Sequence, residues 1–141
     1  ENFQAIHRLS HHVNIILAYR FNDRFSLQVG PSLFHQNLVE RNALNNDLLF
    51  LQCAGRVLLS KHWAFNIEYS PRLIGQQAAT STQALSVSFD WETKGHVFQF
   101  QFSNSRGMVD GLVYSETVGS WTAGDIHYGF NISRDFPIKR R

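Results

Sequence analysis

The chain has 141 residues, of which 43% are hydrophobic and 17% are charged, and its formal net charge is +2. This length and apolar content allow one domain with its own core. The charge is too small and too scattered to predict a nucleic-acid partner, and the single Cys53 excludes an intrachain disulfide. The longest unbroken apolar run, 15–19, is far shorter than the about 20 residues of a membrane helix, so only a closed β-barrel could span lipid.

Every predicted element is a β-strand, because apolar and polar residues alternate with a period of two along most of the chain. In the first strand, Val13 and Leu17 share one face, and Asn14 and Arg20 share the other. The seven predicted strands lie at 13–21, 25–33, 49–59, 63–72, 85–91, 98–102 and 128–133. Several of them approach the roughly 9–11 residues that a tilted transmembrane strand needs.

The sixth strand shows most clearly that the two faces differ. In the stretch HVFQFQFSNS, Phe98, Phe100 and Phe102 point to one face, and Gln99 and Gln101 point to the other. The phenyl face can meet a lipid bilayer while the amides enter a polar lumen. A soluble barrel would reverse this arrangement, with Phe inside and Gln in water. The alternation alone does not distinguish the two.

The connections between the strands alternate in length along the chain. The short ones are FNDRF, LSKHW and TKGH, and the last is a tight hairpin in which Gly95 accepts a positive φ. The long ones lie at 36–47, 74–83 and 105–124. Outer-membrane barrels have this asymmetry, with tight turns facing the periplasm and long loops facing outward.

Aromatic side chains gather beside the short turns, on the apolar face. They are Phe21, Phe25, Trp63, Trp91 and Phe98. Such rings collect where hydrocarbon meets lipid headgroups, and large rings also cap the end of a soluble core. Because the row coincides with the short turns, we favour the membrane. The sequence therefore predicts an all-β, antiparallel, up-and-down transmembrane β-barrel, with residues 1–141 in a single domain.

The polar faces of the strands predict the lining of a lumen. The candidate lining residues are Arg20, Gln28, Arg56, Glu68, Arg72, Asp90, Gln99 and Gln101. In hairpin register, Glu68 lies diagonal to Arg56. Opposite charges in such a lining either pair and keep a small barrel closed, or form the selectivity lining of a pore. We favour the structural pairing.

The histidines near the start of the chain are the first candidates for a metal site. On a strand, His7 and His11 share a face but are about 13 Å apart, which is too far for one metal ion. On a helix they would be an i, i+4 pair that suits zinc, but neither they nor His12 have a carboxylate or thiol beside them. We expect no metal site and no cofactor.

A hydrolytic triad is the second chemical possibility. Ser103, Asp125 and His127 lie on or near the last strands, but no motif of defined spacing joins them. We expect no catalytic residues and no enzyme activity. The stretch GSWTAGD, which includes Asp125, is expected to be a turn that brings Trp121 back over the barrel mouth.

Three stretches of the chain carry a resemblance to known proteins. They are RFSLQVGPSLFHQNLV (24–39), GHVFQFQFSNSRGM (95–108) and GSWTAGDIHYGFNISRDF (119–136). In this order they resemble the carboxy-terminal half of an uncharacterised bacterial outer-membrane β-barrel family, which is a domain of unknown function. The resemblance implies an outer-membrane barrel, with no known activity and no established catalytic residues.

Members of that family are longer and have more strands upstream. The resemblance therefore implies that residues 1–141 are the carboxy-terminal portion of a longer chain. The strand count agrees, because single-chain bacterial barrels have an even number of strands.

These observations lead to one preferred function and two alternatives. We expect a non-enzymatic outer-membrane barrel of unknown cargo, acting as a pore or as a structural surface barrel. The alternatives are a soluble β-barrel that binds an apolar ligand and an outer-membrane hydrolase. The expected partners are outer-membrane lipid, the barrel assembly machinery and upstream strands of the same chain.

Overall fold

The computed structural model of the chain describes residues 9–37, 45–75, 81–107, 113–114, 117–134 and 136. Its strands are β1 (Ser10–Asn14), β2 (Leu17–Arg20), β3 (Phe25–Gln36), β4 (Asp47–Leu58), β5 (Trp63–Ser70), β6 (Arg72–Ile74), β7 (Ala84–Thr93), β8 (His96–Ser103) and β9 (His127–Arg134). No helix in these ranges is long and apolar enough to cross a membrane.

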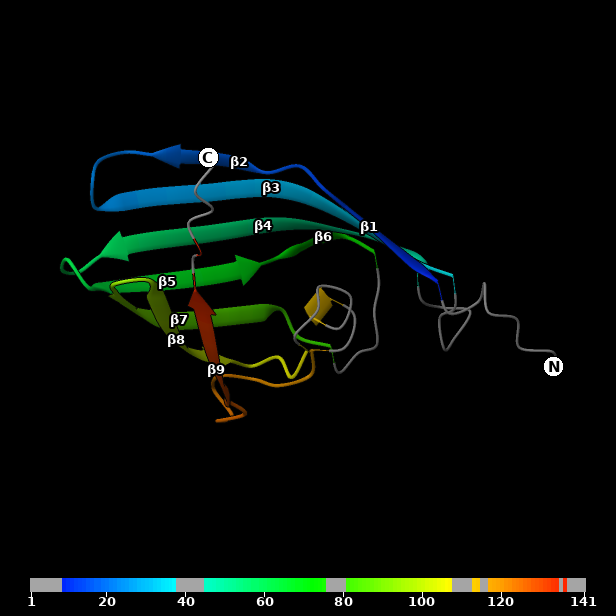
Figure 1. Ribbon diagram of the computed structural model, residues 1–141. Helices are drawn as coiled ribbons and strands as arrows, with labels where there is room; N and C mark the ends of the chain where they lie inside the picture. The colour runs from blue at the N-terminus through cyan, green and yellow to red at the C-terminus, as the bar shows by residue number, and fades with distance from the viewer. Residues whose placement is uncertain are drawn as a thin grey trace.

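The strands pair in chain order to form one antiparallel sheet (Figure 1). β1 and β2 both pair with β3, so together they form one interrupted strand. In the same way, β5 and β6 both pair with β4 and form a second interrupted strand. The described sheet is therefore an up-and-down meander of seven strands, in the order β1/β2, β3, β4, β5/β6, β7, β8 and β9. It curls into a half-barrel (Figure 1). The predicted all-β, antiparallel meander is confirmed.

The first predicted strand is interrupted where the sequence predicts continuous alternation. β1 ends at Asn14 and β2 begins at Leu17, although both pair with β3 in the same register. Between them, the Ile15 N–H donates to the Pro31 carbonyl at 3.1 Å, and the Ile15 carbonyl lies over Gly30. The close approach is possible because Gly30 has no Cβ.

The predicted strand at 63–72 is also interrupted. It divides into β5 and β6 at Pro71, which has no N–H to give to the ladder. The Pro71 carbonyl still accepts a hydrogen bond from the Leu51 N–H at 3.0 Å. Beyond this point the register against β4 shifts between Leu49 and Phe50, which marks a bulge.

The hairpin of β3 and β4 is longer than the sequence predicts. β3 continues past the predicted end at Leu33 to Gln36, and β4 begins at Asp47. The reason is that Phe34 pairs with Leu48 on the inner face, and both side chains are buried.

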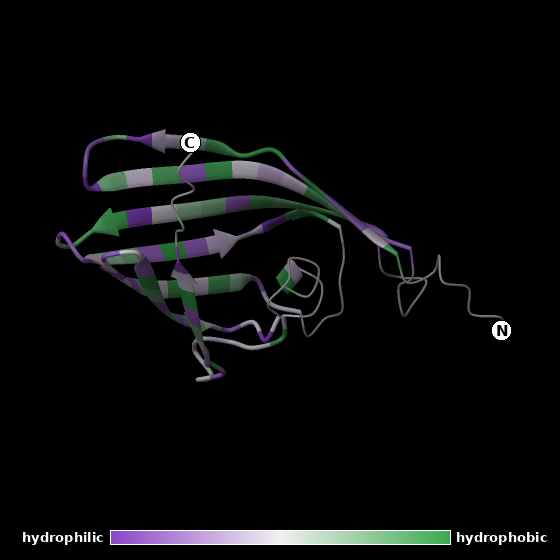
Figure 2. Ribbon diagram, in the orientation of Figure 1, coloured by the Kyte–Doolittle hydropathy of each residue, from purple (hydrophilic) through white to green (hydrophobic). Residues whose placement is uncertain are grey.

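Rows of register partners alternate between apolar and polar residues across the sheet. One row crosses from β3 to β9 through Phe25, Val57, Phe65, Phe89, Phe100 and Phe130. The adjacent row crosses the same strands through Ser26, Arg56, Asn66, Ser88, Gln101 and Gly129. Figure 2 shows this alternation as bands of colour along the strands. Because neighbouring residues point to opposite faces, the sheet has one apolar and one polar face.

The apolar face is the convex one, and it is exposed. Leu27, Ile67, Phe89 and Phe100 are between 37% and 43% exposed, so they do not form a core. The polar face is concave, because polar residues from both sides of the curl meet around one cavity. This arrangement is the reverse of a soluble barrel, which would hold its phenyl rings inside.

The only cluster of buried apolar side chains in the described ranges is small and lies on the concave side. It consists of Phe34 and Leu48, together with Phe50 and Tyr114, and Val113 packs against it. Phe34, Leu48 and Phe50 belong to the end of the β3–β4 hairpin that leads into the long connection. Among the described residues, the large buried apolar side chains of the concave face therefore lie at its long-loop end.

Replacement of Gly30 tests the close contact at the first interruption. A Cβ on Gly30 would lie 2.0 Å from the Ile15 carbonyl oxygen, so Gly30→Ala must displace backbone. We expect the free energy of unfolding to fall by about 1–3 kcal/mol, the usual cost of overpacking. The measurement is urea unfolding of the full-length protein folded into lipid vesicles.

Gly55 provides the matched control in the neighbouring strand. A Cβ there would meet the Ile67 Cγ2 atom at 3.4 Å, an ordinary contact. Gly55→Ala should therefore change the free energy of unfolding by less than about 1 kcal/mol. Equal effects of the two substitutions would show that the Ile15 carbonyl does not constrain Gly30.

Candidate lumen and its two ends

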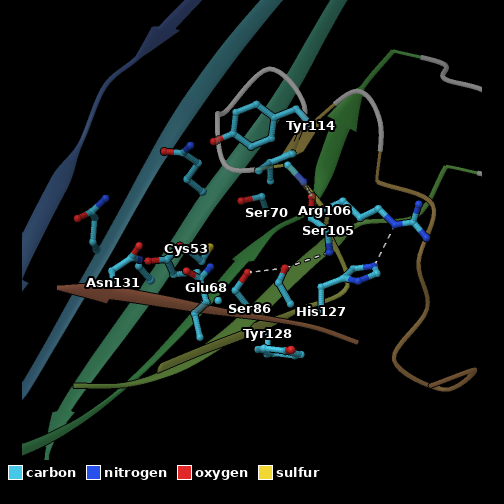
Figure 3. A pocket seen from close by; sticks show the side chains of 18 of the residues that line it. Cys53, Glu68, Ser70, Ser86, Ser105, Arg106, Tyr114, His127, Tyr128 and Asn131 are labelled. Atoms are coloured by element: carbon cyan, nitrogen blue, oxygen red, sulfur yellow. Dashed lines mark hydrogen bonds between the residues drawn. The ribbon is translucent and has the colours of Figure 1, made fainter. Parts of the chain in front are cut away.

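The concave face holds a polar cavity of about 490 Å³. Its floor follows one row of register partners from β3 to β9, which are Gln28, Ala54, Glu68, Ser86, Ser103 and His127. Figure 3 shows Glu68, Ser86 and His127 in this cavity, with Tyr114 at one end of it. Amides, hydroxyls and a carboxylate suit a water-filled interior better than an apolar ligand.

The residues predicted to line a lumen all project from the concave face, as the register requires. Gln28, Glu68 and Gln101 line the cavity described above. A second cavity of about 490 Å³, nearer the short turns, is lined by six of the predicted residues, namely Arg20, Gln28, Arg56, Glu68, Asp90 and Gln99. Arg72 lines neither cavity, because β6 places it at the long-loop end, opposite Phe50.

A charged network occupies the concave face in its short-turn half. The Arg56 guanidinium donates to Asn66 Oδ1 at 2.9 Å and to Glu92 Oε1 at 2.5 Å, and it also pairs with Asp90. The Asp90 side chain is only 7% exposed, so this pair is largely withdrawn from water. Asp90 also accepts a hydrogen bond from Gln99 Nε2 at 3.0 Å.

The predicted neighbour of Arg56 was Glu68, and the register does place the two diagonally. The carboxylates that Arg56 contacts, however, are Asp90 and Glu92, both on β7. Arg56 reaches them across β5, whose inward residue there is Ala64, opposite Asp90. The small side chain of Ala64, which is fully buried, leaves space for the guanidinium.

Aromatic rings pack together at the long-loop end of the concave face. Tyr114 stacks on Phe50 with ring centroids 4.6 Å apart, and its ring lies 5.4 Å from that of His12. Figure 3 shows Tyr114 over the cavity. Sequence reasoning missed this residue because it lies in a predicted loop. The apolar run LVY at 112–114, within a long connection, is the signal that could have identified it.

The segment after β8 is tied to the start of β7. Asn104 Nδ2 donates to the Gly119 carbonyl at 2.9 Å, and Thr82 Oγ1 donates to the same oxygen at 2.6 Å. The turn predicted in GSWTAGD is present, and Gly124 has a φ of 81°. Trp121 Nε1 donates to the Leu85 carbonyl at 3.0 Å, so the indole lies beside the start of β7, at the long-loop end of the sheet.

The residues of the hypothetical triad do not form a relay. Ser103 and His127 are register partners, but Ser103 Oγ accepts from Ser86 Oγ at 2.8 Å, and His127 Nε2 accepts from Arg106 Nε at 3.4 Å. Asp125 accepts from the Ser120 N–H within the turn. None of these hydrogen bonds joins a nucleophile to a base.

The early histidines are also separated. His7 lies outside the described residues, and His11 and His12 point to opposite faces of β1. His11 stacks on His35 with ring centroids 6.3 Å apart, whereas His12 hydrogen bonds to Ser32. The described part of the chain gathers no group of three or more His, Cys, Asp or Glu residues suited to a metal ion.

Three residues of the predicted aromatic row form a contiguous band on the convex face together with Phe130, whereas Phe21 and Phe25 stack on each other beside the β2–β3 turn. Trp63 and Trp91 stack with ring centroids 6.0 Å apart, Trp91 and Phe98 are 5.4 Å apart, and Phe98 and Phe130 are 6.4 Å apart. These residues come from β5, β7, β8 and β9. The band lies beside the short turns, at the level where an aromatic girdle meets lipid headgroups.

Comparison with known proteins identifies a family. The family model described as a membrane bound beta barrel domain (DUF5777) matches residues 1–136. No curated protein and no solved structure matches the chain. The match agrees with an apolar convex face and a polar concave face, and together they overturn the alternative of a soluble barrel with an apolar interior.

Removal of the Arg56 guanidinium tests the charged network. Arg56→Gln leaves the nearly buried Asp90 without its cation, although the hydrogen bond from Gln99 remains. We expect the free energy of unfolding in lipid vesicles to fall by about 1–3 kcal/mol. The double variant with Asp90→Asn should recover part of this loss, because the unpaired charge is removed.

Arg20→Gln is the matched control, because Arg20 pairs with Asp23 in a solvated turn, where the side chains are 66% and 99% exposed. Its effect should be much smaller than that of Arg56→Gln. If the two Arg variants lose equal stability, or if Asp90→Asn recovers nothing, the network does not stabilise the sheet.

Proposed function

Because the chain belongs to this family of membrane-bound β-barrel domains, we propose that it is an outer-membrane barrel of a bacterium with a non-enzymatic role. The observation that carries the proposal is the alternation of apolar and polar rows from β3 to β9. The apolar rows meet lipid, and the polar rows line a lumen that includes the eight residues predicted from the sequence. The role is that of a pore or a structural surface barrel, and its cargo is not assigned.

The asymmetry of the connections supports the outer membrane and an orientation in it. The β2–β3, β4–β5 and β7–β8 turns are short, and the connections at 37–46, 75–83 and 104–126 are long. Outer-membrane barrels direct short turns to the periplasm and long loops outward. The aromatic band beside the short turns then lies at the periplasmic interface.

The open edges of the half-barrel indicate that further strands pair with it. β1 and β2 form one edge of the sheet and β9 forms the other. Lipid cannot satisfy the backbone groups of an open edge, so the edges require additional strands. We assign these strands to upstream residues of the same chain, and we assign their insertion to the barrel assembly machinery.

Reconstitution tests the proposed role. The full-length protein should fractionate with the outer membrane of its bacterium, and in planar lipid bilayers a pore should give stepwise ion conductance. A folded protein without conductance would be the structural barrel, and fractionation with the cytoplasmic membrane would contradict the proposal. Hydrolysis of an ester or amide substrate that is lost on replacement of Ser103 would support the alternative of an outer-membrane hydrolase.

Substitutions on adjacent residues of β8 test which face meets lipid. Phe100→Arg places a cation in the middle of the apolar row and should lower the free energy of unfolding in vesicles by about 2–4 kcal/mol. Gln101→Arg should cost much less, because its side chain enters the polar lumen. Urea titration of the full-length protein in vesicles gives both values.

Conservative changes distinguish lipid from a packed protein interior. Replacement of Phe98, Phe100 and Phe102 together by Leu should have a small effect, because fluid lipid fills the space. Phe50→Leu, inside the buried cluster, should leave a void and cost more per residue. A greater loss per residue from the triple variant would mean that the three rings pack against protein.

A further inference from the structure

Each short turn of the sheet carries one exposed basic residue. Arg24 lies between β2 and β3, Lys61 lies between β4 and β5, and Lys94 lies between β7 and β8. A fourth cation, Arg134, is the last residue of β9. It pairs with His96, so it lies at the same end of the sheet as the short turns. We call these four exposed residues the basic rim.

The carboxylates nearest the basic rim already have other partners. Asp23 pairs with Arg20 at 3.1 Å, and Asp90 and Glu92 pair with Arg56. Arg56 neutralises Asp90 and Glu92 from inside the curl, whereas Asp23 pairs with Arg20 within the exposed β2–β3 turn. Within the described ranges, no carboxylate forms an ion pair with a cation of the basic rim.

The long-loop end of the described sheet lacks this excess of positive charge. Arg72 and Arg106 lie there, together with the acidic Asp47 and Asp125. Positive charge is therefore concentrated at one end of the sheet, and that end is the one that carries the aromatic band.

The basic rim borders the aromatic band on the convex side. Trp63 follows two residues after Lys61, and Trp91 and Phe98 flank the turn that contains Lys94. Arg134 lies with its guanidinium carbon 4.7 Å from the centroid of the Phe136 ring. Cations directly beyond a belt of interfacial rings lie at the depth of lipid phosphates.

We propose that the basic rim binds the headgroup phosphates of anionic phospholipids in the leaflet that faces the short turns. This proposal rests on the proposed membrane function. It adds the class of lipid that is bound and the leaflet in which it is bound. Anionic headgroups fit because their net charge complements the rim, whereas zwitterionic headgroups offer a phosphate whose charge is balanced by an amine.

The tryptophans provide a local probe of this binding. Trp63 and Trp91 lie beside the basic rim, and the third tryptophan, Trp121, lies at the other end of the sheet. With Trp121→Phe as the background, fluorescence quenching by brominated phosphatidylglycerol is compared with quenching by brominated phosphatidylcholine at equal mole fraction. The full-length protein is folded into vesicles of the two lipids.

The wild-type rim should favour phosphatidylglycerol, by at most about fivefold for each cation that contacts a headgroup. The variant Arg24→Gln/Lys61→Gln/Lys94→Gln should lose most of this preference, and 1 M salt should weaken it. The control Arg72→Gln/Arg106→Gln should keep it, because these cations lie at the long-loop end. Inorganic phosphate at matched ionic strength should not displace the lipid.

Three results would overturn the proposal. Equal quenching by the two lipids in the wild type would show that the basic rim has no lipid preference. Equal losses in the rim variant and the control would show a general charge effect, and displacement by inorganic phosphate would indicate a site for free anions. Failure to fold in either vesicle, seen as trypsin sensitivity throughout the chain, would instead contradict the membrane barrel itself.

Discussion

The cross-strand register is the constraint on which the rest of this structure depends. From β3 to β9 the same pairing keeps the phenyl rows of the mid-sheet on the convex side and the polar rows that line the cavities on the concave side. Because side chains alternate with a period of two, a slip of one residue in any strand would turn its apolar series into the lumen. The tight turns at Arg24, Lys61 and Lys94 help to fix that register, because a short turn has no spare residues that could move into either strand.

The interior is stabilised differently at its two ends. Near the short turns, Arg56 connects β4 to β7 through Asp90 and Glu92, and the amide of Gln99 extends the network to β8. Near the long loops, Phe50 and Tyr114 provide apolar contact in place of charge. A curled sheet without a conventional core can thus hold its inner face together by side-chain contacts between strands that are not neighbours.

The sequence predicts the strands and their two faces because alternation is a local property. Each of the eight predicted lumen residues projects from the concave face for this reason. The partners of Arg56 were not predictable, because Arg56 reaches across β5 to β7. The long connection at 75–83 does not fix the pairing register of β5 with β7 in advance. Tyr114 was missed because a loop has no periodicity, and its contacts with β3 and β4 are distant in the chain. The interruption at Ile15 depends on Gly30, a residue of another strand.

The stacking of Tyr114 on Phe50 has a consequence for the order of assembly. The two rings come from distant parts of the chain, and in the folded sheet β5, β7 and β8 separate them along the sequence. Closing so long a loop costs entropy that the apolar contact cannot offset until the intervening hairpins exist. Phe34, Leu48 and Phe50 can meet within one hairpin, so we expect the docking of Tyr114 to be the late step that completes the cluster.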